Sequence, residues 1–225
     1  MGASPLFGLL ALGVAGLAAA ASSLYPRWVT RRVLKRMRSC ARIDISAYPS
    51  GAIRRVVGVV HARGELLEAP LTGRRCVAYE VVVWDGSLRC ADERKAVPFV
   101  LDDRTGRAVV YPEPLALALA LPMAVELAES DPRRRLLLER LAVDLNKRDG
   151  TTREVRCVEA ALEPGWWAAV LGRGVASVDP SGAPPTEHIG GFRAPAEASM
   201  VTIAGSVRVP VCVSDDASVL SDAPR

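Results

Sequence analysis

The chain has 225 residues, of which 50% are hydrophobic and 24% are charged, which suffices for one sizeable folded domain with additional segments. Its formal net charge of +4 is concentrated in one place. Seven basic residues and no acidic residue lie between positions 27 and 42, and subtracting them leaves −3 for the rest of the chain. A basic groove for nucleic acid is therefore not expected, and we predict no nucleic-acid partner.

The first 26 residues carry no charged side chain, and Pro5 to Tyr25 is an almost entirely aliphatic run of 21 residues. A bilayer core about 30 Å thick is crossed by roughly 20 apolar residues in a helix. Residues 1–26 are therefore predicted to be a transmembrane anchor. A cleaved signal peptide is the alternative, because residues 17–22 offer a cleavage site, but the required basic start is missing.

The basic residues follow the apolar run directly, in a juxtamembrane segment at residues 27–46. By the positive-inside rule, we expect a single-pass membrane protein with its C-terminal domain in the cytoplasm. Val29, Val33 and Met37 recur every four residues, which is typical of an amphipathic helix on an anionic lipid surface. A solvated basic linker is the alternative. The residues expected at the membrane surface are Arg27, Trp28, Arg31, Arg32, Lys35, Arg36 and Arg38.

From about residue 47 the pattern changes to alternation of apolar and polar residues, which predicts β-strands. Alternating runs occur near residues 56–61 and 76–84, and further strand-forming runs occur near residues 97–101, 107–111, 152–158, 166–171 and 201–214. The fold class is therefore mainly β, barrel- or sandwich-like and α+β at most, with the transmembrane helix and one or two short helices. The β-rich domain is placed at residues 47–216, and a disordered tail is expected at residues 217–225.

One helix is expected within the β-rich domain. Asp131 followed by Pro132 is typical of a helix N-terminus, and leucines recur four residues apart after it. Lysine, arginine and Gly150 then predict the C-terminus.

Cys76 is the residue that most directly raises the question of catalysis. Arg74 and Arg75 precede it and would favour a reactive thiolate. However, the alternation places Cys76 on the same strand face as Ala78 and Val82, which favours a packed, unreactive thiol. We therefore predict no catalytic residue, and no enzymatic activity of the chain by itself.

Metal and cofactor sites are not indicated either. The five cysteines and two histidines are scattered, without the clustered spacing of zinc ligands. The adjacent Asp102 and Asp103 suit a metal or acid–base pair, but a hairpin turn closed by aspartate side chains is the preferred interpretation. No phosphate-binding, dinucleotide-binding or nucleophile-elbow motif occurs in the sequence, so no cofactor is predicted.

Several pieces of the sequence together resemble one known family. They are a Pro-Leu-Thr-Gly turn before a Cys and a Tyr, an Asp–Gly turn, and a Glu with a following Pro-Gly and a later Gly. This set is similar to the GIDE domain, the "beside a membrane" domain of membrane-anchored E3 ubiquitin ligases, in its bacterial, RING-less form. The residues that carry the resemblance are Pro70, Leu71, Thr72, Gly73, Cys76, Tyr79, Asp103, Gly106, Glu159, Pro164, Gly165 and Gly172.

The resemblance implies a RING finger and a second transmembrane helix in the eukaryotic relatives, and this chain departs from both. Its Cys and His residues are fewer than the eight ligands that a RING requires. We therefore expect a membrane-anchored, non-enzymatic binding or scaffold module whose partners are anionic lipid head groups and another protein. An accessory component of a ubiquitin-like transferase pathway is the alternative, and a thiol-dependent enzyme ranks third.

Overall fold

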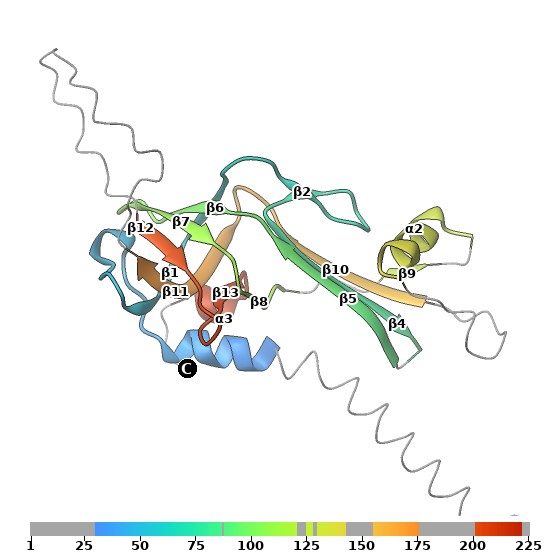
Figure 1. The fold of residues 1–225 in the computed structure, drawn as a ribbon, viewed down its shortest axis with the longest axis horizontal. Helices are drawn as coiled ribbons and strands as arrows, with labels where there is room; N and C mark the ends of the chain where they lie inside the picture. Colours follow the sequence, from blue (N-terminus) through green and yellow to red (C-terminus); the bar gives the residue numbers. More distant parts are fainter. Residues whose placement is uncertain are drawn as a thin grey trace, which may run out of the picture.

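The computed structural model of the protein describes residues 30–86, 88–120, 125–127, 130–142, 155–175 and 201–221. Strands dominate these residues and the helices are short, which confirms the mainly β prediction (Figure 1). Within the described residues, no helix is long and apolar enough to cross a membrane. The predicted anchor at residues 1–26 lies outside them, as do Arg27 and Trp28.

Five strands close a barrel. In order around it they are β1 (Ile53–Ala62), β6 (Phe99–Asp102), β7 (Arg107–Tyr111), β12 (Val201–Ala204) and β11 (Trp167–Val175). The barrel closes because β1 pairs with both β6 and β11. Only β7 and β12 run parallel among these five neighbours, and the order and directions are those of an OB-fold barrel. Beyond β11 the wall continues through β13 (Val211–Ser214) and β8 (Leu115–Leu117).

Alternation along the strands directs one side chain in two into the barrel, as the sequence predicted. Val56, Phe99 and Ile203 are completely buried in this core. Two glycines allow the strands to approach closely. A Cβ on Gly58 would lie 2.6 Å from the backbone oxygen of Asp102, and a Cβ on Gly172 would clash with the side chain of Ile203.

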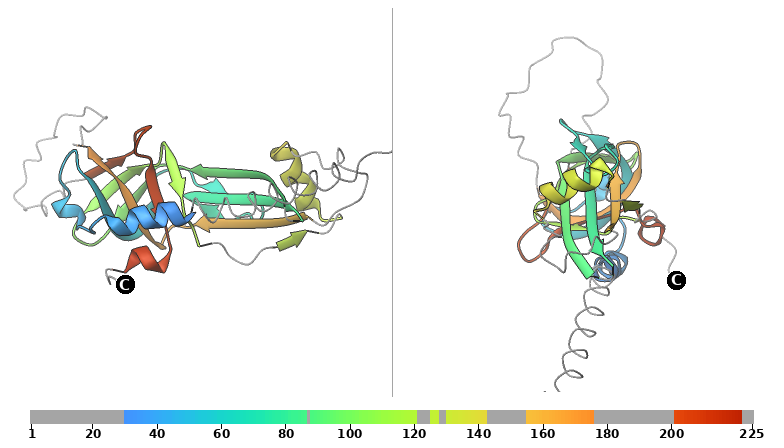
Figure 2. Two further views of the ribbon diagram at one scale, coloured as in Figure 1. Left: turned by 90° about the horizontal axis from the view of Figure 1, so that it is seen from below. Right: turned by 90° about the vertical axis from the view of Figure 1, so that its right-hand side faces the viewer.

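A second sheet projects from the barrel along the long axis of the molecule (Figures 1 and 2). Its strands, in order, are β5 (Leu88–Ala96), β4 (Ala78–Asp85), β10 (Val155–Leu162) and β9 (Val125–Leu127). Strand β10 leads into β11 through a tight turn, so the projecting sheet and the barrel are connected directly. One face of this sheet is covered by α2 (Pro132–Arg140) and by the hairpin of β2 (Leu67–Glu68) and β3 (Arg75–Cys76).

Helix α2 begins as predicted, because the side chain of Asp131 accepts a hydrogen bond from the backbone N–H of Arg133, and Pro132 occupies the first turn. Its predicted end at Gly150 is wrong. The helix ends at Arg140, where Leu141 is the C-cap residue and Ala142 takes a positive φ of 52°. Left-handed backbone at Ala142 turns the chain out of the helix axis.

The disordered tail was predicted to begin at residue 217, and this start is wrong. Residues 217–220 form a short helix, α3 (Ala217–Leu220), whose first turn is capped by Asp216. Val219 is completely buried and packs with Met37 and Cys212 on the outside of the barrel. The Val219 carbonyl also accepts a hydrogen bond from Arg55 over 2.8 Å, and these contacts with distant residues give no local signal in the sequence.

An N-terminal helix at residues 30–39 lies along the outer wall of the barrel (Figure 1). Its apolar side is the predicted one, since Val33 is only 8% exposed and Met37 is completely buried. The expected partner of that apolar side was lipid, and this is wrong. It packs against Val57 and Leu171 of the barrel, because the outer face of β1 and β11 is itself apolar here.

Candidate functional site

The residues that carry the family resemblance do not form one site. One group lies over the projecting sheet, and includes the 70–73 loop, Cys76, Tyr79 and Glu159. The Asp103–Gly106 turn lies at the end of the β6–β7 hairpin. Gly172 lies in the barrel wall. Each group has a contact that explains why its residue types occur there.

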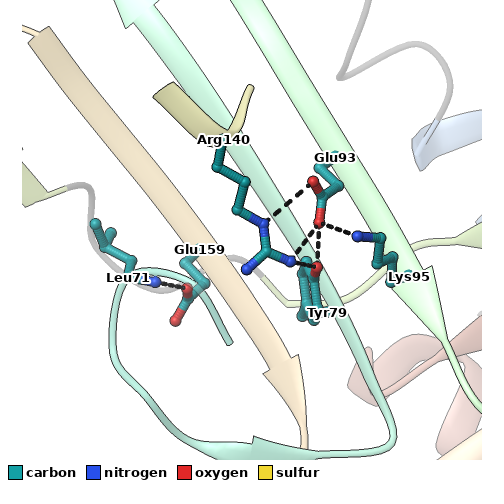
Figure 3. A network of polar contacts seen from close by, with 6 residues as sticks. All are labelled: Leu71, Tyr79, Glu93, Lys95, Arg140 and Glu159. Carbon is teal, nitrogen blue, oxygen red and sulfur yellow. Dashed lines mark hydrogen bonds and ion pairs between the residues drawn. The ribbon is translucent and has the colours of Figure 1, made fainter. Parts of the chain in front are cut away.

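The 70–73 loop is held by the side chain of Glu159, which is only 3% exposed. The backbone N–H of Leu71 donates to Glu159 Oε2 over 2.6 Å, and the Thr72 hydroxyl donates to Glu159 Oε1 over 2.5 Å. Gly73 takes a positive φ of 69°, which lets its N–H donate to the carbonyl of Ala69. Figure 3 shows the contact between the loop and Glu159.

The turn at Pro164 and Gly165 connects the same region to the barrel. Gly165 takes a positive φ of 90°, and its N–H donates to the carbonyl of Val60 over 2.8 Å. Just before the turn, Glu163 accepts a 3.0 Å ion-pair contact from Arg74 of the loop. The 70–73 loop is therefore connected to the turn by the Arg74–Glu163 pair, and the turn to the barrel by the backbone of Gly165.

Beside Glu159, a second polar cluster joins helix α2 to the sheet (Figure 3). Arg140 donates from Nη2 to Glu93 Oε1 over 2.8 Å and to the Tyr79 hydroxyl over 2.5 Å. The Tyr79 hydroxyl itself donates to Glu93, and Lys95 forms an ion pair with Glu93 over 3.1 Å. Tyr79 belonged to the predicted set, whereas Glu93, Lys95 and Arg140 were missed. Glu93 and Lys95 lie in a charged run where no strand was expected, and Arg140 lies in the expected helix, so no pattern in the sequence joined the three.

The protonation states within this cluster are fixed. Burial alone would raise the pKa of Glu93, but hydrogen bonds from Arg140, Tyr79 and Lys95 outweigh it and lower that pKa to about 2. Burial and the contact with Glu93 together raise the pKa of the Tyr79 hydroxyl. At neutral pH the cluster therefore joins an anionic carboxylate to cationic partners and a neutral phenol. These contacts hold helix α2 against the sheet.

Cys76 is completely buried, with Sγ 3.8 Å from the carbonyl oxygen of Leu67. Burial, followed by the nearby Glu159 and Glu163, raises the pKa of the thiol to about 11, and the opposing effect of Arg74 is smaller. The thiol is therefore protonated at neutral pH and poorly nucleophilic.

The strand face predicted for Cys76 is wrong. Cys76 packs with Tyr79 and Val81 under α2, and not with Ala78 and Val82. The alternation is interrupted at Val77, which lies between β3 and β4. There the Val77 N–H donates to Leu162, and the Val77 carbonyl accepts from Val97. The sequence alone gives no sign of this interruption.

The two adjacent aspartates close a turn, as the preferred interpretation expected. Asp103 Oδ1 accepts from the backbone N–H groups of Thr105 and Gly106, at 2.8 and 3.0 Å. Its second oxygen accepts from Ile45 N over 2.7 Å, which ties the hairpin to the short helix η1 (Ile45–Ala47). Among the described residues, no group of three or more Cys, His, Asp or Glu side chains could hold a metal ion.

Four of the residues predicted at the membrane surface are exposed on helix 30–39. Arg31, Arg32, Lys35 and Arg38 are exposed, and we refer to these four as the basic side. Arg36 is partly buried. Positions 31, 35 and 38 are three or four residues apart, so they lie on one helix face, opposite to Val33 and Met37.

Comparisons of this chain with protein families, with curated proteins and with solved structures found no match.

Proposed function

We propose that this chain is a membrane-tethered, non-enzymatic binding or scaffold module whose β-domain is held against an anionic bilayer. The observation that carries the proposal is the orientation of helix 30–39. Its apolar side is fixed to the barrel through Val33 and Met37, and its basic side points away from the barrel. The helix therefore follows the apolar N-terminal segment in the chain, packs on the β-domain and presents its basic side to the surroundings.

The charges on the basic side of helix 30–39 are sufficient for a weak attraction to an anionic membrane surface. Each basic residue near an anionic leaflet contributes about 1 kcal/mol, so the four residues of the basic side contribute on the order of 4 kcal/mol at low salt. The rest of the chain after the basic stretch carries −3 and would be repelled by the same surface. Screening shortens to roughly 3 Å at 1 M salt, so the attraction should fade there.

A non-enzymatic role is supported by the chemistry of the polar clusters. The Cys76 thiol is buried with a raised pKa, and the Glu93 carboxylate is neutralised by Arg140 and Lys95. Glu159 holds a loop through both of its oxygens. These groups stabilise the fold around the projecting sheet. The family proposal, a RING-less GIDE-type domain, and the accessory role in a ubiquitin-like pathway rest on the resemblance of the motif residues.

The test is vesicle flotation with a chain that lacks residues 1–25 and retains helix 30–39. We expect flotation with anionic vesicles at low salt and none with neutral vesicles. Changing Arg31, Arg32, Lys35 and Arg38 to glutamine should abolish it. The matched control changes four exposed arginines elsewhere, Arg75, Arg104, Arg135 and Arg208, to glutamine and should float like the parent. Equal flotation with neutral vesicles, or equal loss in both quadruple variants, would contradict the proposal.

The cytoplasmic location is tested separately with the full chain. Alkaline phosphatase fused after Arg225 should be inactive in bacterial cells, and a fluorescent reporter at the same place should fluoresce. An active periplasmic phosphatase, or a mature chain that lacks residues 1–22, would contradict the proposed topology.

A further inference from the structure

The tip of the β4–β5 hairpin, residues 84–86 and 88–89, lies on the same side of the molecule as helix 30–39. Figure 1 shows both at the lower side, and the right-hand view of Figure 2, which shares the vertical direction, agrees. Helix α2 and the β2–β3 hairpin lie toward the upper side, over the other face of the sheet (Figure 1). The left-hand view of Figure 2 shows that helix 30–39 runs along the long axis.

The tip carries a row of three residues, of which Trp84 and Arg156 are suited to contact with a bilayer surface. Trp84 is opposite Arg89 of β5 on one side and opposite Arg156 of β10 on the other. Directly opposed residues on neighbouring strands share one face of a sheet. Because Val83 packs under α2, its neighbour Trp84 faces away from α2. Arg156 is exposed and Trp84 is partly buried, whereas the Arg89 side chain is only 10% exposed and forms a 2.7 Å ion pair with Asp92.

We propose that Trp84 and Arg156, at the free end of the projecting sheet, are a second contact of the protein with the anionic bilayer, so that this end of the sheet approaches the membrane instead of pointing away from it. The inference rests on the proposed function, since it takes helix 30–39 as the first contact. Tryptophan is enriched at membrane–water interfaces, and arginine is attracted to anionic head groups. A row that combines them, on the side already occupied by the basic side of helix 30–39, fits an anionic phospholipid surface.

The other exposed tryptophans provide an internal comparison. Trp166 and Trp167 are each 45% exposed, at the turn between β10 and β11. Figures 1 and 2 show this turn at the upper side, away from helix 30–39. The residue opposite Trp167 on β1 is Val59, so the basic neighbour that Trp84 has is absent from this described pair. Trp166 and Trp167 are more exposed than Trp84, but they should not contact lipid because they lie on the far side of the molecule.

The test uses tryptophan fluorescence of the full chain in vesicles of anionic lipid with bromine near the glycerol end of the acyl chains. Three variants isolate the probes. W28F/W166F/W167F keeps Trp84, W28F/W84F keeps the distal pair, and S39W in a chain with all four native tryptophans changed to phenylalanine reports on helix 30–39. Circular dichroism spectra that match the parent establish that each variant is folded.

We expect brominated lipid to quench Trp84 and the Ser39→Trp probe strongly and to leave the distal pair almost unquenched, because bromine quenches only indoles that it contacts. Quenching at Ser39→Trp without quenching at Trp84 would overturn the second contact and leave the proposed function intact. Quenching of the distal pair in place of Trp84 would also overturn it. Absence of quenching at both Ser39→Trp and Trp84 would overturn the proposed function itself.

A charge variant gives a second, independent readout. R156Q in the chain that keeps Trp84 should reduce the population in contact with anionic lipid about fivefold, as expected for the loss of one basic residue at the surface. R75Q, which removes an exposed arginine of the β2–β3 hairpin, should leave the quenching of Trp84 unchanged. Equal effects of the two substitutions would overturn the assignment of Arg156.

Discussion

Glu159 shows how one buried residue can organise a loop from a distance of almost ninety positions in the chain. It receives hydrogen bonds from Leu71 and Thr72, and it is only 3% exposed. We expect Glu159→Ala to lower the free energy of unfolding by about 1–3 kcal/mol, because the buried Leu71 N–H loses its partner. Denaturant unfolding measures this change.

The matched control is Glu163→Ala, which removes the partly exposed ion pair with Arg74. Such pairs contribute less than about 1 kcal/mol, so this variant should remain close to the parent. If both variants lose the same stability, the buried position of Glu159 has no special role.

Cys76 should behave as a packed thiol. Its complete burial and its raised pKa predict very slow alkylation by iodoacetamide in the folded protein, and complete alkylation on unfolding. Cys40 is partly exposed and serves as the internal reference in the same mass-spectrometric experiment. Alkylation of Cys76 before Cys40 in the folded protein would favour the thiol-dependent enzyme.

Glu93 should make stability sensitive to acid. Its pKa falls from 4.5 to about 2 on folding because hydrogen bonds from Arg140, Tyr79 and Lys95 outweigh the effect of burial. A lowered pKa in the folded state stabilises the protein above pH 4.5, and this contribution is lost as the pH falls toward 2. The stability difference between the parent and Glu93→Gln should therefore shrink as the pH decreases from about 6 to about 3. Glu139→Gln, at an exposed ion pair, should show no such trend.

At the scale of elements, α2 is held to the sheet at its C-terminal end by Arg140. Arg140→Gln removes the contacts with Glu93 and Tyr79. We expect local opening of residues 132–142 to become roughly fivefold more frequent, equivalent to about 1 kcal/mol for a partly exposed charged contact. Hydrogen exchange read by mass spectrometry measures this, with strands β1 and β11 as unaffected regions. Arg135→Gln, on the exposed side of the same helix, should leave the exchange of α2 unchanged.

Elements with strong local signals were predictable from the sequence. Alternation located β1 and β4, the apolar runs on each side of the Asp–Gly turn located β6 and β7, and the Asp131–Pro132 pair located the start of α2. The signals failed where a tertiary contact decides the structure. The break at Val77 depends on hydrogen bonds to Leu162 and Val97, and the order of α3 depends on the burial of Val219. Such contacts join residues that are distant in sequence, so local patterns do not contain them.

At the scale of the whole molecule, closure of the barrel was beyond sequence reasoning. The pairings that close the barrel join β1 to β11 and β7 to β12. The two strands of each pair are about a hundred residues apart in the sequence. For the same reason, the motif residues could be recognised as a set, but their division among a loop, a hairpin and the barrel wall could not. The charged partners Glu93 and Arg140 become visible only when the sheet brings them together with Tyr79.

The amphipathic pattern of helix 30–39 was predictable, but the surface that each side contacts was not. Its apolar residues cover the barrel, and its basic side is exposed on the opposite face of the helix. Attachment of the β-domain to an anionic surface through this side is the central claim of the proposed function.

The most direct measurement is the rate at which phenylglyoxal modifies individual arginines of the full chain in nanodiscs, read by mass spectrometry. On anionic discs, Arg31, Arg32 and Arg38 should react several-fold more slowly than on neutral discs, because bound head groups shield them. Arg75, Arg104 and Arg208, which are also exposed, should react at equal rates on both. Equal rates for Arg31, Arg32 and Arg38 on neutral and anionic discs would contradict the claim.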